Sequence, residues 1–418
     1  MKDVYIIGSF STQFKKWPEK EYRDLVREAY LGVLADAKME NGDEIEFGWF
    51  GNCGMGGVGQ PSIRGQVCFI PLVREGLFPE RIPMINVEGA CATASMALHG
   101  AWKDVLSGQC QVSLALGVEK LYFPQVDKAT ALKGFAGGMD NFTPEETLQV
   151  YEDAGKLIQE QFSSGDNRTL FMDTYAMQAK YHMWKFGTTQ RQIAVGSSKN
   201  HNFGALNPKA QYQFEVSVEQ ALEDYLVSYP LTRSMCAPIG DGAAAAIVCS
   251  EDYLKNLPSE VQNRAVKIKA SVLSGGKYRE FNESGLSKTA ADKAYETCGV
   301  KPDDIDVAEV HDATSFCEIY QVEMMGFCPI GEGGKFVEDG QTSLGGQVPI
   351  NTGGGLVSKG HPVGATGLSM VYELTTQLRG EAGDRQVKGA RLALQENGGG
   401  VIGFEEAACS VIILEKDK

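Results

Sequence analysis

The sequence has little positive charge for its length. Its 418 residues include 39 Lys and Arg against 54 Asp and Glu, which gives a formal net charge of −15 at pH 7. Proteins that bind nucleic acid rely on clustered Lys and Arg to neutralise phosphates. We therefore expect no nucleic-acid partner, and an anionic substrate would need a local positive patch.

Long apolar runs are also absent from the sequence. A helix that crosses a bilayer needs roughly 20 consecutive, mostly apolar residues, and no stretch of the chain approaches that length. The opening stretch MKDVYIIGSF has a short apolar run but no small-residue cleavage site, so no secretory signal is expected. Together these features predict a protein without a membrane partner.

Paired cysteines with metal-ligand spacing are missing too. The ten cysteines are scattered and form no C-x-x-C pair. This pattern predicts no metal site in the chain and suits free thiols in the reducing cytoplasm, most of them buried as small apolar side chains. The glycine-rich stretch 51–66 lacks the GK[ST] ending of a phosphate loop, so we interpret it as a loop that faces substrate or another subunit.

The chain does contain alternating strand and helix patterns. Hydrophobic residues make up 43% and charged residues 22%, which is typical of a folded globular protein, and the length suits two domains or one large layered unit. The pattern indicates an α/β fold. Strands are predicted in Asp3–Gly8, Gln111–Gly117, Gly240–Ser250, Val266–Ser274 and Ala407–Glu415, with helices between them.

Two parts of the chain repeat one pattern. The segments GDGAAAAIVCSEDYL at 240–254 and FEEAACSVIILEKDK at 404–418 have the features of one element used twice. We predict duplicated α-β-α-β-α layered halves, the first formed by residues 1–118 and 236–260 and the second by residues 261–418. Residues 119–235 are richer in Phe, Tyr, Met, Gln and Asn, and we interpret them as an inserted lid or loop domain.

The stretch Asn351–Met370 is the strongest candidate for an active-site wall. His361 lies in it where a glycine-dense loop gives way to a helix, and the glycines allow close approach of the backbone. The alternative is a packed turn whose histidine fills a gap in the hydrogen bonding. His182 and His201, in the insertion, are expected to be packing or surface residues.

Cys91 and His311 also lie at strand ends. The strand 81–87 runs into Cys91 at the start of a small-residue helix, where free N–H groups and the helix dipole are expected to lower the pKa of the thiol. The alternative is a core cysteine at a tight helix start. A thiol and two imidazoles are the components of a thiolate-based acyl-transfer site, and duplicated halves would bring Cys91 and His361 to a central seam.

Taken together, these residues resemble the thiolase superfamily over essentially the whole chain. Cys91 in a strand-to-helix turn, Gly360-His361-Pro362 and Gly398-Gly399-Gly400 match the family's motifs in order and approximate spacing. The loop 311–314, His-Asp-Ala-Thr, is similar to the His-Asp loop of the archaeal and sterol-carrier-protein-associated branch. The resemblance implies a thiolase fold and coenzyme A as co-substrate.

The resemblance also implies roles for these residues. Cys91 would attack a thioester or ketone carbonyl after giving its proton to His361. The N–H groups of Cys91 and Gly398 would form one oxyanion hole, and His311 with His361 would hold the thioester oxygen of the second acyl group. Asp312 would orient a neighbouring backbone or imidazole group.

One departure from the family pattern concerns the second catalytic cysteine. Related enzymes carry it two residues after the position of His311 or just before the final glycine turn, where this chain has Ala313 and Glu396. Glu396 is a candidate base for the carbon acid, and a salt-bridged loop carboxylate is its alternative role. Cys317, six residues after His311, is a second candidate.

The implied reaction is thiolytic cleavage, or the reverse Claisen condensation, of a β-ketoacyl-CoA through an acyl-cysteine. Within the branch, the resemblance extends to an enzyme of anaerobic toluene degradation that splits benzoylsuccinyl-CoA into benzoyl-CoA and succinyl-CoA. It implies a homodimer or larger assembly and a small zinc-ribbon and OB-fold accessory subunit. The alternatives are an acetoacetyl-CoA thiolase, a condensing synthase of the same fold, and a catalytically silent acyl-CoA-binding subunit.

Overall fold

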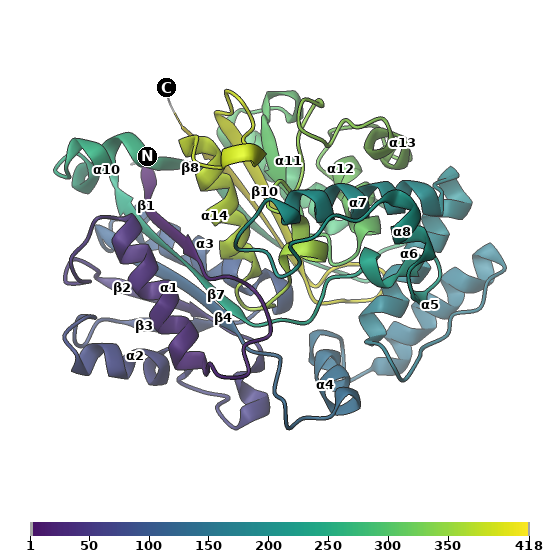
Figure 1. Ribbon diagram of the computed structural model, residues 1–418, viewed down its shortest axis with the longest axis horizontal. Helices are drawn as coiled ribbons and strands as arrows, with labels where there is room; N and C mark the ends of the chain where they lie inside the picture. The colour runs from purple at the N-terminus through teal and green to yellow at the C-terminus, as the bar shows by residue number, and fades with distance from the viewer. Residues whose placement is uncertain (1–2, 417–418) are drawn as a thin grey trace.

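A nine-stranded mixed sheet runs through the molecule (Figure 1). The structure is a computed structural model, and it describes residues 3–416. The strand order is β3-β2-β4-β7-β1-β8-β11-β10-β9. The strands are β1 (Val4–Ser11), β2 (Phe47–Gly51), β3 (Met84–Val87), β4 (Val112–Glu119), β7 (Gly242–Ser250), β8 (Val266–Gly275), β9 (Val307–Glu309), β10 (Leu392–Gly399) and β11 (Ala408–Glu415).

The sheet repeats the same arrangement on either side of its centre. There β1 pairs with β8 in the antiparallel direction. On one side, β7 follows, then an antiparallel β4 and a parallel β2. On the other side, β11 follows, then an antiparallel β10 and a parallel β9. The predicted duplication is therefore confirmed, and the two similar segments form the equivalent strands β7 and β11.

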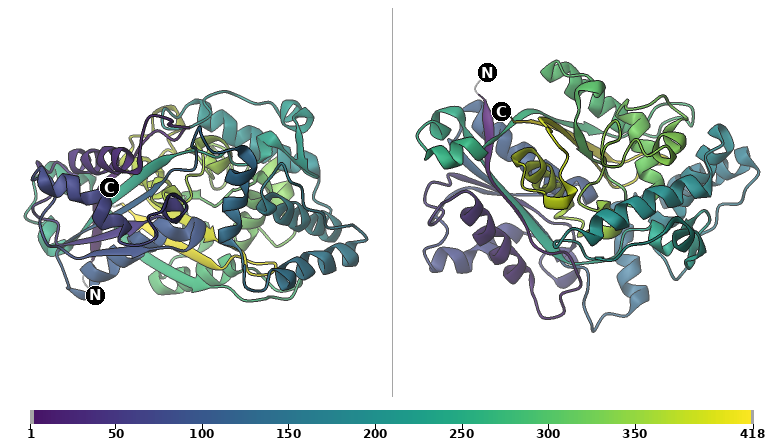
Figure 2. Two further views of the ribbon diagram at one scale, coloured as in Figure 1. Left: turned by 90° about the horizontal axis from the view of Figure 1, so that it is seen from below. Right: turned by 45° about the horizontal axis from the view of Figure 1, so that its top comes forward.

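Two helices form a layer between the halves of the sheet. Helices α3 (Thr93–Ser107) and α14 (Thr366–Arg379) contact one another, and their apolar faces pack in one cluster with side chains of strands from both halves. Outside the first half lie α1 (Tyr22–Asp36) and α2 (Arg64–Arg74), and outside the second half lies α11 (Leu286–Cys298). The order of layers is thus α-β-α-β-α, which the right view of Figure 2 shows edge-on.

The segment between β4 and β7 is largely helical. It extends to one side of the sheet in Figure 1. The sequence pattern predicts helices at 145–162, 169–186 and 189–200, and the structure confirms all three. Its elements are α4 (Lys128–Gly134), α5 (Pro144–Ile158), α6 (Leu170–Phe186), α7 (Gln190–Ala205), α8 (Val218–Glu223) and the hairpin β5 (Leu226–Ser228) and β6 (Leu231–Thr232). The domain boundaries at 118, 235 and 260 stay a prediction.

The glycine-rich stretches 51–66 and 326–346 are both predicted from the sequence to be loops, but a helix forms in each. Helix α2 begins within the glycine-rich stretch 51–66, and α13 (Gly333–Glu338) lies in the long glycine-rich segment after α12 (Ser315–Met324). Two short helices, α9 (Glu251–Leu254) and α10 (Ser259–Arg264), join β7 to β8. Within residues 3–416, no helix is long and apolar enough to cross a membrane.

Candidate active site

Cys91 lies in a tight turn between a strand and a helix, as the sequence predicted. Strand β3 ends at Val87, a 3₁₀ turn covers Ala90–Ala92, and α3 begins at Thr93. Ala90 has a φ of 50°, a left-handed conformation that costs energy in a residue other than glycine. This sharp turn ends the strand and sets Cys91 at the edge of a cavity.

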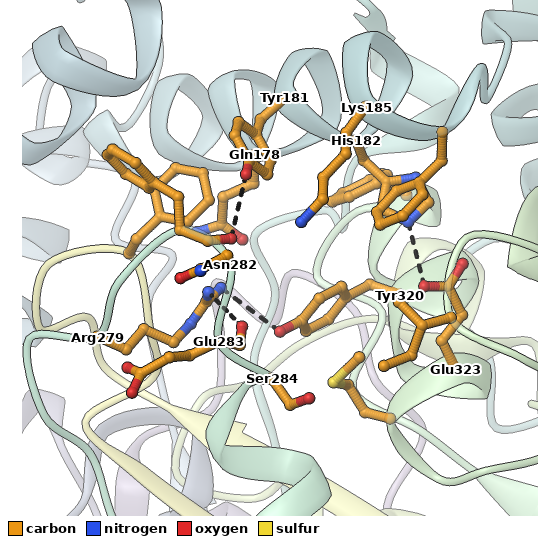
Figure 3. Close-up of a pocket in the computed structure, with 16 residues that line it drawn as sticks. Gln178, Tyr181, His182, Lys185, Arg279, Asn282, Glu283, Ser284, Tyr320 and Glu323 are labelled. Carbon is orange, nitrogen blue, oxygen red and sulfur yellow. Dashed lines mark hydrogen bonds and ion pairs between the residues drawn. The ribbon is translucent and has the colours of Figure 1, made fainter. Parts of the chain in front are cut away.

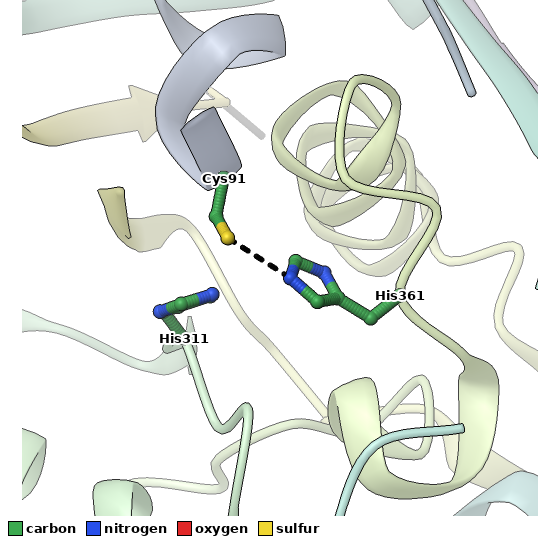
Figure 4. Close-up of side chains that lie close together, drawn as sticks. All are labelled: Cys91, His311 and His361. Carbon is green, nitrogen blue, oxygen red and sulfur yellow. Dashed lines mark hydrogen bonds between the residues drawn. The ribbon is translucent and has the colours of Figure 1, made fainter. Parts of the chain in front are cut away.

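His361 is held with one ring nitrogen toward the sulfur of Cys91. Its Nε2 lies 3.1 Å from Cys91 Sγ (Figure 4). Its Nδ1 lies 2.7 Å from Thr366 Oγ1. Thr366 donates its own hydroxyl hydrogen to the carbonyl of Pro362, so its oxygen accepts the Nδ1–H of the ring. The Nε2 lone pair is therefore free to take the proton of the thiol.

His311 completes the group from the opposite side. Its ring lies edge-on to that of His361 with centroids 5.3 Å apart, and ligand atoms of Cys91, His311 and His361 all lie within 4.8 Å of one another (Figure 4). The Nε2 atom of His311 is buried and has no hydrogen-bond partner in the described chain. An unpaired buried nitrogen at this place suits a ligand oxygen. The ligand atoms of Cys91, His311 and His361 also lie close enough together to bind a metal ion.

Burial keeps all three side chains uncharged. It raises the pKa of Cys91 to about 12, although the N–H groups of Gly400 and Cys91 act in the opposite direction. It lowers the pKa of His311 to about 4, and burial together with His311 lowers the pKa of His361 well below its usual value. The expected lowering of the thiol pKa by the helix start is therefore not found, because desolvation outweighs it.

The glycine turn at the end of β10 approaches Cys91 through Gly400, whereas the sequence predicted Gly398. The N–H of Gly400 points to the sulfur of Cys91, whereas the N–H of Gly398 faces the carboxylate of Glu396. The reason is that β10 continues through Gly399, which pairs with Ala408, so the turn begins only at Gly400 with a φ of 67°. Gly400 replaces Gly398 as the candidate oxyanion donor.

Glu396 and Cys317 are not brought to the nucleophile. The carboxylate of Glu396 accepts the backbone N–H of His311 at 3.0 Å and contacts the thiol of Cys409 at 3.5 Å. Burial and the nearby Glu406 raise the pKa of Glu396 to about 8. Cys317, in the first turn of α12, pairs with the hydroxyl of Thr314 at 3.3 Å. Neither residue lines the cavity that opens on Cys91.

Asp312 links the two loops that carry the histidines. Its carboxylate accepts the backbone N–H of Leu356 at 2.6 Å and the side-chain amide of Asn200 at 2.8 Å. Leu356 lies in a π-helical turn, Gly355–Lys359, that leads directly to His361. Asn200 and Thr366 were not singled out in the sequence, since a polar residue on a helix shows no partner until the chain folds.

A cavity of about 1110 Å³ opens from Cys91 and His361 toward the inserted segment. Its wall is mostly apolar and includes Phe123, Phe135 and Phe171, with Lys120 and Arg168 as cationic members. A space of this size matches the upper range of small-molecule sites.

His182 and His201 lie away from Cys91 and bond to other parts of the protein, in agreement with the packing role predicted for them. His182 contacts Thr188, and His201 contacts the carbonyl of Ser234.

A second, much smaller cavity of about 70 Å³ lies between α6, α12 and the segment before α11 (Figure 3). Arg279 reaches across it to the carbonyls of Glu280 and Glu283 and to the hydroxyl of Tyr320. This cavity is separate from the Cys91 cavity, because the two share no lining residue.

Comparison with known proteins agrees with this geometry. Residues 4–218 match the model of the thiolase N-terminal domain, and residues 277–415 match that of the thiolase C-terminal domain-like family. The chain is 36% identical over 409 residues to an acetyl-CoA acetyltransferase of Methanothermobacter thermautotrophicus, covering 96% of this chain and 98% of that protein. It is 36% identical to human sterol carrier protein 2, covering 98% of this chain and 74% of that protein.

Two further proteins to which the chain is similar are named as parts of complexes. The subunit BbsB of benzoylsuccinyl-CoA thiolase from Thauera aromatica is 31% identical over 391 residues, covering 93% of this chain and 92% of that protein. The solved structure of the Ltp2-ChsH2(DUF35) aldolase has the same fold, with a TM-score of 0.77, 21% identity and coverage of 100% of this chain and 98% of that one. The fold, the Cys91 turn and these matches place the chain in the thiolase family, among the acyl-CoA C-acyltransferases.

Proposed function

We propose that the protein cleaves a β-ketoacyl-CoA by thiolysis through an acyl group carried on Cys91. The observation that supports this most directly is the 3.1 Å contact between Cys91 Sγ and an unprotonated His361 Nε2. A neutral thiol beside a neutral imidazole is a competent nucleophile and base pair, because the proton moves to the ring as the sulfur attacks.

In the first half-reaction, Cys91 attacks the keto carbon of the substrate and His361 takes the thiol proton. The developing oxyanion is stabilised by the N–H groups of Cys91 and Gly400, which already point to the sulfur. The carbon–carbon bond then breaks, and the fragment that carries coenzyme A leaves as its enolate. His311 Nε2, which lacks a protein partner, donates to the enolate oxygen.

In the second half-reaction, the thiol of coenzyme A attacks the acyl-Cys91 thioester. His361 accepts the proton of coenzyme A and returns one to Cys91, so the nucleophile is regenerated. Glu396 and Asp312 act here as positioning residues, because each carboxylate holds a backbone N–H of a histidine-bearing loop.

For the substrate we propose benzoylsuccinyl-CoA, which would give benzoyl-CoA and succinyl-CoA. The 31% identity to BbsB supports this choice. So does the aromatic wall of Phe123, Phe135 and Phe171, which suits a phenyl ring. Acetoacetyl-CoA is the second candidate, favoured by the 36% identity to an acetyl-CoA acetyltransferase.

We further propose a homodimer in the cytoplasm that works with a small accessory subunit of the DUF35 kind. Strand β3 is an edge of the sheet, and its outward-facing Ile85 is 36% exposed, which suits pairing with a second copy. The ten cysteines are all free, in keeping with a reducing compartment. The accessory subunit is supported by the fold shared with the Ltp2-ChsH2(DUF35) aldolase.

Trapping the acyl-enzyme tests the reaction. We expect incubation with benzoylsuccinyl-CoA, without free coenzyme A, to leave a benzoyl group on Cys91 that peptide mass spectrometry locates. Acetoacetyl-CoA would leave an acetyl group if it is the substrate. The Cys91→Ser variant is expected to lose roughly 10³-fold or more in turnover. Full turnover by that variant would exclude the proposed mechanism.

A further inference from the structure

The cleavage leaves one proton unaccounted for among the residues so far described. When the carbon–carbon bond breaks, the electron pair moves to the α-carbon of the departing acyl-CoA, and that carbon must receive a proton. Related enzymes use a second cysteine for this step, and this chain has Ala313 and Glu396 in those places. The inference below rests on the proposed thiolytic function.

Most protic groups in the cavity wall already have partners within the protein. The thiol of Cys236 donates to the carbonyl of Thr232 at 3.3 Å, and that of Cys53 to the carbonyl of Ala90 at 3.3 Å. The carboxylate of Glu119 accepts hydrogen bonds from the N–H groups of Cys53 and Gly54. These bonds hold the groups in the wall rather than toward a substrate.

Tyr175 differs from them. It comes from α6, lines the same cavity as Cys91, His361 and Ala313, and is 9% exposed. Its ring packs in one cluster with Ala313 and Cys317, next to the site where relatives carry their second cysteine. Its hydroxyl makes no hydrogen bond within residues 3–416 that the structure records.

Other buried tyrosines show how unusual this is. The hydroxyls of Tyr30, Tyr181 and Tyr295 each donate to a backbone carbonyl, and that of Tyr151 accepts from Gln178. The Tyr175 oxygen is not among the fully enclosed unpaired atoms of the described residues, so it is open to the cavity rather than sealed in the core. A hydroxyl that is held by no protein group and open to a substrate cavity is available to a substrate.

We propose that Tyr175 is the catalytic acid that protonates the α-carbon of the departing acyl-CoA. The O–H bond of Tyr175 breaks as the C–H bond forms. The phenolate then regains a proton from the imidazolium of His361, which had taken it from Cys91. The proton is conserved, and no other reactant is needed.

The electrostatics of the cavity agree with a donor role. Burial, with the neighbouring thiols of Cys317 and Cys91, raises the pKa of Tyr175 well above its usual value. The phenol therefore stays protonated throughout the physiological range. Proton transfer from this phenol to the enolate carbon is still downhill, because that carbon is a much stronger base than a phenolate.

The test separates acyl transfer from carbon–hydrogen chemistry. Exchange of labelled coenzyme A into benzoyl-CoA needs Cys91 and His361 alone, whereas exchange of the α-hydrogen of succinyl-CoA with deuterium from solvent needs the α-carbon acid. We expect Tyr175→Phe to slow α-hydrogen exchange and overall cleavage by about 10² to 10⁴. Coenzyme A exchange should change by less than about threefold, which also shows that the variant is folded.

The control is a second buried tyrosine, and different results would overturn the role of Tyr175 and the proposed function. Tyr151→Phe removes another buried hydroxyl, outside the cavity wall, and should leave both exchanges unchanged. Normal α-hydrogen exchange in Tyr175→Phe, or its loss in Cys236→Ala instead, would overturn the assignment of Tyr175. Failure of the unmodified enzyme to exchange coenzyme A at all, with acetyl-CoA as well as benzoyl-CoA, would instead remove the proposed function.

Discussion

At the scale of single residues, Thr366 decides which nitrogen of His361 faces the thiol. Thr366→Val keeps the shape but removes the acceptor for Nδ1–H, so the ring can adopt the wrong tautomer or rotate. We expect kcat to fall roughly 10- to 100-fold, less than the loss on removing a general base outright. Thr366→Ser should recover most of the rate, and steady-state kinetics would measure both.

The resting state of Cys91 gives a second prediction. Because burial raises the pKa of this thiol to about 12, its alkylation by iodoacetamide should keep accelerating above pH 9 in the free enzyme. An ordinary cysteine, with a pKa near 8.5, would approach a plateau there. Labelling followed by mass spectrometry of the Cys91 peptide gives the profile. A plateau below pH 7 would mean that the free enzyme holds a thiolate.

Glu396 links the site to the pH dependence of folding. Its pKa rises from 4.5 to about 8 on folding, so the native state binds more protons than the unfolded state between these values. Stability therefore declines as pH rises through this window. Glu396→Gln keeps an acceptor for the N–H of His311 and should make the decline shallower. Urea titrations at pH 5 and pH 8 compare the two proteins, and parallel declines would contradict the prediction.

At the scale of elements, the close contact between strand β10 and the Cys91 turn constrains the site. A Cβ at Gly399 would lie 2.2 Å from the carbonyl of Gly89 and 2.5 Å from the nitrogen of Ala92, both backbone atoms. We expect Gly399→Ala to destabilise the protein by about 1–3 kcal/mol and to move Cys91 away from His361. Gly275→Ala, with open space around its Cβ, is the matched control in thermal melts and rate assays.

The elements also show how far the sequence could be interpreted. The strands and the repeated half were predictable because apolar periodicity and small-residue runs are local signals. Helix α2 was missed because Pro71 lies inside it, and α13 because it begins with two glycines. In both helices, packing outweighs weak local propensity.

The site shows the same division between local and distant signals. Cys91, His311 and His361 stand in recognisable motifs at strand ends, so their roles followed from the sequence and the family resemblance. The role of Gly400 as a donor could not be predicted, because only the pairing of Gly399 with Ala408 reveals where the strand ends. The role of Tyr175, one of 15 tyrosines, and the raised pKa of Cys91 could not be predicted either, since both depend on which distant segments enclose the cavity.

At the scale of the whole molecule, the exposed edge of β3 bears on assembly. If two copies pair along this edge, Ile85→Lys should place two like charges across the interface and favour the monomer. Light scattering after size exclusion, over a range of concentrations, would report the change. A variant with the mass of the unmodified protein at every dilution would locate the interface elsewhere.

The central position of β1 has a consequence for synthesis of the chain. Residues 4–11 leave the ribosome well before both of their neighbours in the sheet, because residues 242–250 and 266–275 emerge more than two hundred residues later. An apolar strand therefore waits unpaired while most of the nascent chain is made, which is the situation in which aggregation competes with folding. Chaperone capture during translation should accordingly concentrate on the first segment and end only when the second half has begun to appear.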